Sequence, residues 1–266
     1  MAYLFSTRSG SSLYVEDVGS GPPVLALHGI GGGAYFFGGF SKRLQSRYRI
    51  ISIDLPGTGN SPSAVQPVTL ESTVADIGDF VSAKVGQPVF IVGHSFGTIV
   101  GLKAWEMWPE WIRAFVFTCG LPKVRPNVHE RLSLRAEDIR KNGIPGWGAK
   151  MSAGVYSKAT LRDKLEVANL NERIFEDQDP ASYVRSIEIL LGADLRSVVP
   201  TVNVPCMAVI GAEDSYAPPE AAKEFISGLT VECREEILTD CGHMPFFEQP
   251  EKYADLVGSF LDGLQR

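Results

Sequence analysis

The sequence lacks several features that mark specialised classes of protein. It has 266 residues and only four cysteines, at Cys119, Cys206, Cys233 and Cys241. Their spacing lacks the close pairs of a zinc site, no uncharged apolar run approaches the roughly 18 residues that a membrane helix needs, and the first residues contain no apolar stretch long enough for a signal peptide. We therefore expect a cytoplasmic protein with reduced thiols, no metal and no membrane segment.

Excess positive charge is also absent. The chain carries 25 Lys and Arg against 31 Asp and Glu, a net charge of −6, and nucleic acid is an unexpected partner because phosphate binding needs a basic face. The 27 glycines and 17 prolines follow no period, which excludes collagen-like and low-complexity architectures. With 44% hydrophobic and 21% charged residues, the composition indicates one large globular domain with a sizeable core.

Short apolar runs separated by segments of helical period dominate the first half. Residues 3–6 and 13–18 flank a Gly-Ser-Ser turn and predict a hairpin. Four further apolar runs follow at 24–28, 49–54, 89–93 and 114–118, with helical segments at 70–84 and 98–108. Continuous apolar strands that alternate with helices predict an α/β fold, in which a mostly parallel sheet is covered by helices on both faces.

This alternation stops for about 80 residues after the sixth predicted strand. Segments 132–142, 160–169 and 180–191 read as helices, and strands resume at 205–211 and 231–238, with helices at 219–228 and 250–264. The last units need the earlier sheet as a partner. We therefore predict one core, residues 1–122 and 200–266, interrupted by a helical lid, residues 123–199, which is called the cap segment below.

A candidate nucleophile lies where the predicted strand 89–93 meets the next helix. Gly93-His94-Ser95-Phe96-Gly97 fits a tight strand-to-helix turn, in which small residues on both sides relieve crowding and the central hydroxyl stands at the helix N-terminus. The alternative interpretation of Ser95 is a plain helix cap.

A serine hydroxyl needs a base and an acid that orients the base. Of the four histidines, we expect His94 to point away from Ser95 and His28 to make a structural hydrogen bond. We expect His129, which lies in the cap segment, to be exposed or hydrogen-bonded without a catalytic role. His243 follows the last strand, at the sheet edge where α/β proteins place their chemistry. Asp214 follows the preceding strand, 29 residues before His243, and its neighbour Glu213 is the competing acid.

A site that stabilises negative charge on the substrate oxygen is predicted after the strand at 24–28. In His28-Gly29-Ile30-Gly31-Gly32-Gly33, the glycines let the backbone approach a ligand. The backbone N–H groups of Ile30 and Phe96 would then form an oxyanion hole, although a plain flexible turn is the alternative.

These motifs together resemble the α/β-hydrolase superfamily. The resemblance rests on His28-Gly29, Asp54-Leu55-Pro56-Gly57-Thr58-Gly59-Asn60-Ser61, Gly93 to Gly97, Gly211 to Asp214 and Gly242-His243-Met244-Pro245. The order serine, acid, histidine belongs to this family. Within it, the chain looks loosely similar to 3-oxoadipate enol-lactonases, meta-cleavage-product hydrolases and cofactor-free haloperoxidases. Thr98 departs from the pattern, because many relatives have glycine there.

The resemblance implies a serine hydrolase that cleaves a small carboxylic ester or lactone through an acyl-enzyme, without a metal or organic cofactor. C–C bond hydrolysis and perhydrolysis use the same triad and stay open. A ligand receptor on the same scaffold is an alternative of another class. A nicotinamide or flavin oxidoreductase is a further alternative, because Gly29 to Ala34 fits a dinucleotide pattern with Asp54 at the expected distance. Against it stand the preceding hairpin and the poor helix start at Gly38-Gly39.

The cap segment is expected to set substrate choice. Trp147 is our candidate for a pocket wall, and Cys119 and Cys241 are expected to be buried fillers near the site. Six basic residues gather in the first part of the segment, at Lys123, Arg125, Arg131, Arg135, Arg140 and Lys141. They predict attraction of a carboxylate-bearing substrate, with a solvated helix face as the alternative for each.

Overall fold

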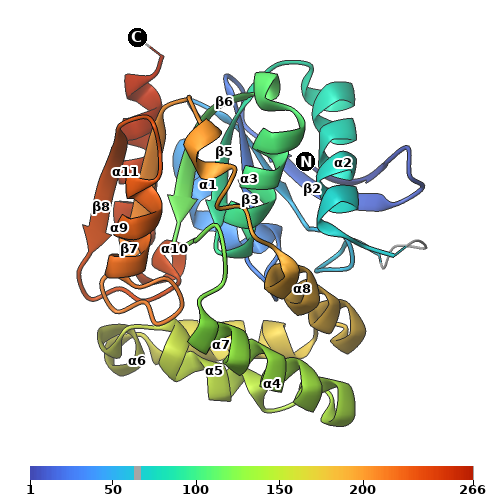
Figure 1. Ribbon diagram of the computed structural model, residues 1–266, viewed down its shortest axis with the longest axis vertical. Coiled ribbons are helices and arrows are strands. Elements are labelled where there is room, and N and C mark those ends of the chain that lie inside the picture. Colours follow the sequence, from blue (N-terminus) through green and yellow to red (C-terminus); the bar gives the residue numbers. More distant parts are fainter. Residues whose placement is uncertain (63–66, 266) are drawn as a thin grey trace.

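An eight-stranded sheet forms the centre of the protein (Figure 1). The computed structural model describes residues 1–62 and 67–265, so positions 63–66 and 266 of the predicted core lie outside the described residues. The strands are β1 (Ala2–Ser6), β2 (Ser12–Val18), β3 (Pro23–Leu27), β4 (Arg49–Ile53), β5 (Val89–His94), β6 (Ile112–Thr118), β7 (Cys206–Gly211) and β8 (Cys233–Leu238). Their spatial order is β1-β2-β4-β3-β5-β6-β7-β8.

The sheet is antiparallel at one edge and parallel elsewhere. β1 pairs with β2 and β2 with β4 in antiparallel fashion, which confirms the predicted hairpin, whereas all pairs from β4 to β8 are parallel. The carboxyl ends of β3 and β5 to β8 therefore meet at one edge, where ligand sites of α/β sheets form.

Helices cover both faces of the sheet, as predicted. They are α1 (Gly38–Leu44), α2 (Leu70–Phe80), α3 (Phe96–Met107), α9 (Pro219–Ser227), α10 (Pro245–Glu248) and α11 (Pro250–Gly263), with short helical turns η1 (Ala34–Phe37), η2 (Val81–Val85), η3 (Pro109–Trp111) and η4 (Val199–Thr201). Alternate residues of β3 enter separate clusters: Leu25 packs with α2 and α3, and Val24 with α1 and α11. Both faces are buried, which explains the continuous apolar runs.

Five helices lie between β6 and β7 and stand beside the sheet, below it in Figure 1. They are α4 (Pro126–Asn142), α5 (Trp147–Val155), α6 (Lys158–Asp163), α7 (Leu165–Glu176) and α8 (Pro180–Gly192). The two ends of this segment meet, because the Leu195 N–H donates to the Pro122 carbonyl oxygen at 2.9 Å and Lys123 pairs with Asp194. The chain thus leaves the core and returns to it at one place.

One predicted helix was wrong in its extent. The segment predicted as one helix over 160–169 is broken at Lys164, whose φ of −138° is not helical, so α6 ends and α7 begins there. The Lys164 ammonium donates to the backbone oxygen of Glu248 at 2.7 Å, a contact with the core that local periodicity does not reveal. Among the described residues, no helix has both the length and the apolar composition that crossing a bilayer requires.

Candidate active site

Ser95 occupies a strained turn between β5 and α3. Its φ of 51° lies in the left-handed region that non-glycine residues rarely adopt, and its N–H donates to the Thr118 carbonyl oxygen at 2.9 Å. A Cβ on Gly97 would lie 2.0 Å from the Leu27 oxygen, and one on Gly93 would lie 2.6 Å from the Gly97 oxygen. The two glycines are therefore required by close backbone packing, which leaves Ser95 as the side chain presented at the turn.

Thr98, which departs from the family pattern, fits behind this turn. Its hydroxyl donates to the Gly93 carbonyl oxygen at 3.2 Å. A Cβ on Gly120 would lie 1.9 Å from the Thr98 oxygen, so the larger side chain is matched by glycine on the neighbouring strand end.

Asp214 and His243 are brought together from the loops after β7 and β8. The Asp214 carboxylate lies 2.8 Å from His243 Nδ1 through one oxygen, and its other oxygen accepts the N–H groups of Tyr216 and Ala217 at 2.8 and 3.0 Å. Burial alone would raise the pKa of Asp214, but His243 and these N–H groups lower it below the ordinary value. Glu213 is exposed and accepts the Lys158 N–H instead, so of the two candidate acids it is Asp214 that bonds the imidazole.

A buried carboxylate that sequence reasoning missed holds the His243 loop. Glu248 is 1% exposed. One oxygen accepts the N–H groups of Gly242 and Met244 at 2.8 and 3.2 Å, and the other accepts the Ser157 N–H at 2.8 Å and the Thr160 hydroxyl at 2.9 Å. Glu248 thereby ties the loop after β8 to the cap segment.

The cap segment also bonds directly to the candidate base. The His243 N–H donates to the Val155 carbonyl oxygen at 2.7 Å, and a Cβ on Gly242 would lie 2.5 Å from that same oxygen. The imidazole position is consequently set from two sides, by Asp214 from the sheet edge and by the end of α5 from the cap segment.

The predicted oxyanion donors, Ile30 and Phe96, lie in the loop after β3 and in the first turn of α3. Within residues 1–62 and 67–265, neither backbone N–H donates a hydrogen bond, and the first N–H groups of a helix have no partner within it. In the same part of the chain, the Ser95 hydroxyl makes no hydrogen bond to His243, and catalytic hydrogen bonds often tighten only when substrate is bound.

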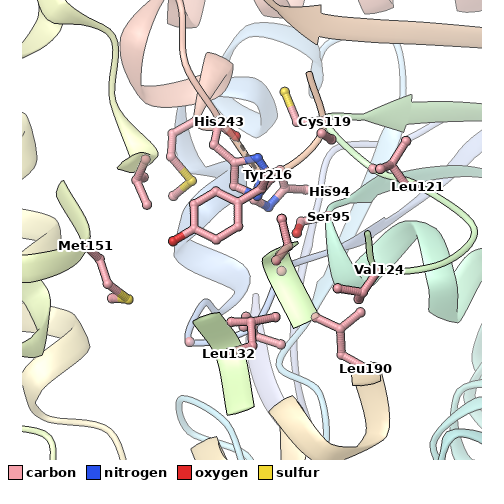
Figure 2. A pocket seen from close by; sticks show the side chains of 18 of the residues that line it. His94, Ser95, Cys119, Leu121, Val124, Leu132, Met151, Leu190, Tyr216 and His243 are labelled. Carbon is pink, nitrogen blue, oxygen red and sulfur yellow. Dashed lines mark hydrogen bonds between the residues drawn. The ribbon is translucent and has the colours of Figure 1, made fainter. Parts of the chain in front are cut away.

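One pocket joins these groups to the cap segment (Figure 2). It encloses about 110 Å³ and is lined by Ser95, His243 and Ile30, together with side chains of α4, α5, α7 and α8. Ser95, His94 and His243 gather at one end, and Leu132 and Leu190 lie at the other. The arrangement can hold a small, largely apolar molecule against the hydroxyl and the imidazole.

Trp147 is not among the residues that line this pocket, so the prediction for it was wrong. Its indole N–H donates to Asp138 at 2.8 Å, and its ring lies under the cations of Arg135 and Lys150. Met151, one turn further along α5, lines the pocket instead. The helical register of this glycine-flanked segment could not be read from its sequence, and register decides which side chain faces inward.

His28 and His129 take the expected places, and His94 has contacts at the site that the sequence did not indicate. His28 accepts the Leu55 N–H at 2.9 Å, and His129 is exposed. His94 lines the pocket, its ring lies 4.9 Å from the His243 ring, and its Nε2 bonds the His243 carbonyl oxygen at 2.9 Å. Burial lowers the pKa of His94 well below its ordinary value, so a neutral ring packs against the candidate base.

Cys119 lines the pocket close to the acid and the base. Its sulfur, the Asp214 carboxylate and the His243 imidazole have ligand atoms within 4.8 Å of one another. Burial, followed by the charge of Asp214, raises the pKa of the Cys119 thiol well above its ordinary value, and metal binding needs the thiolate. The neutral thiol and the engaged Nδ1 of His243 favour a packing role for Cys119 over a metal site.

The dinucleotide alternative is not supported by the loop after β3. The Asp54 carboxylate accepts the N–H groups of Ala34 and Asn60 and is 2% exposed, so it joins two loops and offers no free oxygen to a ribose. A Cβ on Gly31 would meet Phe175 and Tyr183 of the cap segment. The short turn η1 follows the glycines, and the α-helix after it, α1, spans only Gly38–Leu44.

Comparison with known proteins identifies the family of the chain. A family model described as "Alpha/beta hydrolase family" matches residues 24–256. The pimeloyl-[acyl-carrier protein] methyl ester esterase of Methylococcus capsulatus is 26% identical over 268 residues, which cover 94% of this chain and 98% of that protein. The 2-hydroxy-6-oxononadienedioate/2-hydroxy-6-oxononatrienedioate hydrolase of Klebsiella pneumoniae is 26% identical, with 94% and 90% covered.

A solved structure shows the same fold. The enol-lactonase from Burkholderia xenovorans LB400 superposes with a TM-score of 0.90 at 19% identity, over 98% of this chain and 100% of that one. With the family model matched over most of its length, the chain belongs to the alpha/beta hydrolase family.

Proposed function

We propose that the protein is a serine hydrolase that cleaves a small carboxylic ester or lactone through an acyl-enzyme. The observation that carries the proposal is the 2.8 Å contact between Asp214 and Nδ1 of His243, whose side chain lines the same pocket as the strained Ser95. This arrangement supports the assignment of Ser95 as nucleophile, His243 as base and Asp214 as the acid that orients the base.

In the proposed mechanism, Nδ1–H of His243 donates to Asp214, which leaves the Nε2 lone pair free to accept a proton. Nε2 takes the Ser95 proton as the hydroxyl oxygen attacks the carbonyl carbon, and the N–H groups of Ile30 and Phe96 hold the resulting oxyanion. His243 then protonates the leaving alcohol oxygen. Water attacks the acyl-enzyme with His243 again as base, releasing the acid and restoring Ser95.

Covalent labelling of the nucleophile tests this assignment. A fluorophosphonate should form one adduct, located on Ser95 by mass spectrometry. Ser95→Ala should lower kcat on a simple ester by several orders of magnitude, since removing a triad nucleophile leaves only the residual contribution of binding. Ser227→Ala is the matched control, because this exposed serine bonds only its own helix, at the Glu224 oxygen. A label on another residue, or a tenth of the activity left in Ser95→Ala, would contradict the proposal.

Hydrolysis of a C–C bond in a dicarbonyl substrate is the second candidate, because it uses the same three groups and because one relative is named as a hydrolase of a 2-hydroxy-6-oxo dienedioate. A panel of esters, lactones and vinylogous diketones would separate the two reactions, and addition of peroxide would test perhydrolysis. A receptor would release one equivalent of product from excess ester and then stop.

A further inference from the structure

A buried guanidinium without a carboxylate partner lies in the wall of the pocket. Arg135 of α4 is 6% exposed and lines the cavity. Three other cations in the first part of the cap segment have acidic partners: Lys123 pairs with Asp194, Arg140 with Glu188 and Lys141 with Glu137. Within residues 1–62 and 67–265, no ion pair forms at Arg135.

Two neutral phenols are the partners of Arg135. One terminal nitrogen donates to the Tyr183 hydroxyl at 3.2 Å and the other donates to the Tyr216 hydroxyl at 2.9 Å. The Nε–H is buried, and no described residue accepts a hydrogen bond from it. A guanidinium offers five N–H donors, so most of its donor capacity is unused by the protein.

A buried charge is costly unless an opposite charge and hydrogen bonds compensate it. Burial alone would lower the pKa of Arg135, but the two phenol oxygens raise it above the ordinary value, so the group stays cationic. The described part of the chain supplies hydrogen-bond acceptors but no countercharge, which suits a site whose anion arrives with a ligand.

The position of the guanidinium relates it to the candidate triad. Tyr216, whose hydroxyl accepts from Arg135, places its ring 5.0 Å from the His243 ring. In Figure 2 that hydroxyl points away from His243, toward the side of the pocket where Met151 lies. Arg135 therefore lies about one tyrosine side chain from the imidazole. Its guanidinium carbon lies over the Trp147 ring, 5.4 Å from the ring centroid. The apolar side chains of Leu132 and Val128, from the same helix as Arg135, also line the pocket.

We propose that Arg135 is a specificity-determining residue that binds a carboxylate at the far end of the substrate from the bond cleaved. This inference rests on the proposed function and narrows its substrate class to half-esters of dicarboxylic acids, or lactones that carry a carboxylate. The planar fork of arginine matches a carboxylate. One buried cation balances the single negative charge of a carboxylate.

A matched pair of substrates tests the inference. Monomethyl esters of dicarboxylic acids of increasing chain length should be cleaved with higher kcat/KM than methyl esters of the corresponding monocarboxylic acids, with one chain length preferred. Arg135→Gln should lower the ratio of the two kcat/KM values about 30-fold, because a hydrogen-bonded charge pair is lost. Arg135→Lys should keep part of the ratio. Arg140→Gln, on the exposed side of the same helix, is the control and should keep all of it.

Binding without turnover gives a second readout. Calorimetry with Ser95→Ala should detect the preferred half-ester, and adding Arg135→Gln should weaken its binding by a similar factor. Circular dichroism shows whether Arg135→Gln folds. If it does not, the inference is tested by comparing how strongly the dicarboxylate and its uncharged diamide inhibit the wild-type enzyme. Preference for the dicarboxylate supports the inference, and equal inhibition overturns it.

Failure of this inference is distinguishable from failure of the proposed function. If neutral esters are hydrolysed and Ser95 is labelled, but Arg135→Gln leaves the substrate ratio unchanged, the carboxylate site is wrong and the hydrolase assignment stands. If no ester of either kind is hydrolysed and Ser95 takes no label, the proposed function is wrong and the inference falls with it.

Discussion

At the scale of the residue, the site depends on positions where only a hydrogen atom fits. Gly97 contributes no side chain to chemistry, yet it decides whether α3 can approach β3 closely enough to present Ser95. The motif around Ser95 therefore has a role in backbone packing in addition to its chemical role.

Replacing Gly97 by alanine tests that packing role. The new Cβ would lie 2.0 Å from the Leu27 carbonyl oxygen, and backbone must move to make room, so we expect Gly97→Ala to destabilise the fold by at least about 2 kcal/mol and to abolish most activity. Urea unfolding and ester hydrolysis measure the two effects.

Gly38→Ala is the matched control. Gly38 has helical backbone angles, with φ of −58°, and a Cβ there meets nothing within 4 Å. This substitution should leave activity intact and stabilise the fold by up to about 1 kcal/mol, because alanine restricts the unfolded chain more than glycine does. Equal effects of the two substitutions would refute the packing argument.

At the scale of the element, the loop after β8 is shaped by contacts distant in sequence. Glu248 lies at the end of α10, five residues after His243, and its hydrogen-bond donors come from both the core and the cap segment. The site is therefore a product of how α5 and α6 dock on this loop as well as of the sheet edge.

Glu248→Gln should disturb both partners of this contact. An amide keeps one accepting oxygen but presents N–H groups to the other pair of donors, so two buried donors lose their acceptor. We expect a loss of about 1–3 kcal/mol in the free energy of unfolding and a lower kcat, since His243 shifts with its loop. Glu251→Gln, exposed at the start of α11, should change neither quantity. Wild-type values for Glu248→Gln would show that the carboxylate is dispensable.

Sequence could predict the elements better than their docking. The strands and the order Ser95, Asp214, His243 follow from local periodicity, turn residues and a family pattern. Each of these signals depends on a few neighbouring residues. The burial of Arg135, the register of α5 that turns Trp147 away from the pocket, and the role of Glu248 depend on which helices meet in space. No short segment of the chain contains that information.

At the scale of the whole molecule, burial governs the chemistry of the thiols. All four cysteines are free. Burial raises the pKa of Cys233 to about 12, and burial likewise raises the pKa values of Cys119, Cys206 and Cys241. The thiolate is the reactive form, so the folded protein should protect all four.

Thiol titration checks this expectation. At pH 8, fewer than one thiol per chain should react with a disulfide reagent within minutes, and iodoacetamide should leave esterase activity unchanged. In guanidinium chloride all four should react, because unfolding restores ordinary pKa values near 8.5. Rapid reaction of a native thiol together with inactivation would show that Cys119 or Cys241, the two thiols beside the site, is accessible.

The bond from the His243 N–H to the Val155 carbonyl oxygen has a consequence for engineering. One way to change the substrate range of such an enzyme is to replace residues 123–199 by the corresponding segment of another enzyme. Here the donor segment would have to bring its own carbonyl to the same point, or the base would lose its backbone anchor. Chimeras should therefore be joined so that native residues 155–160 are retained, and a library built on that rule should yield more active members than one that replaces the whole segment.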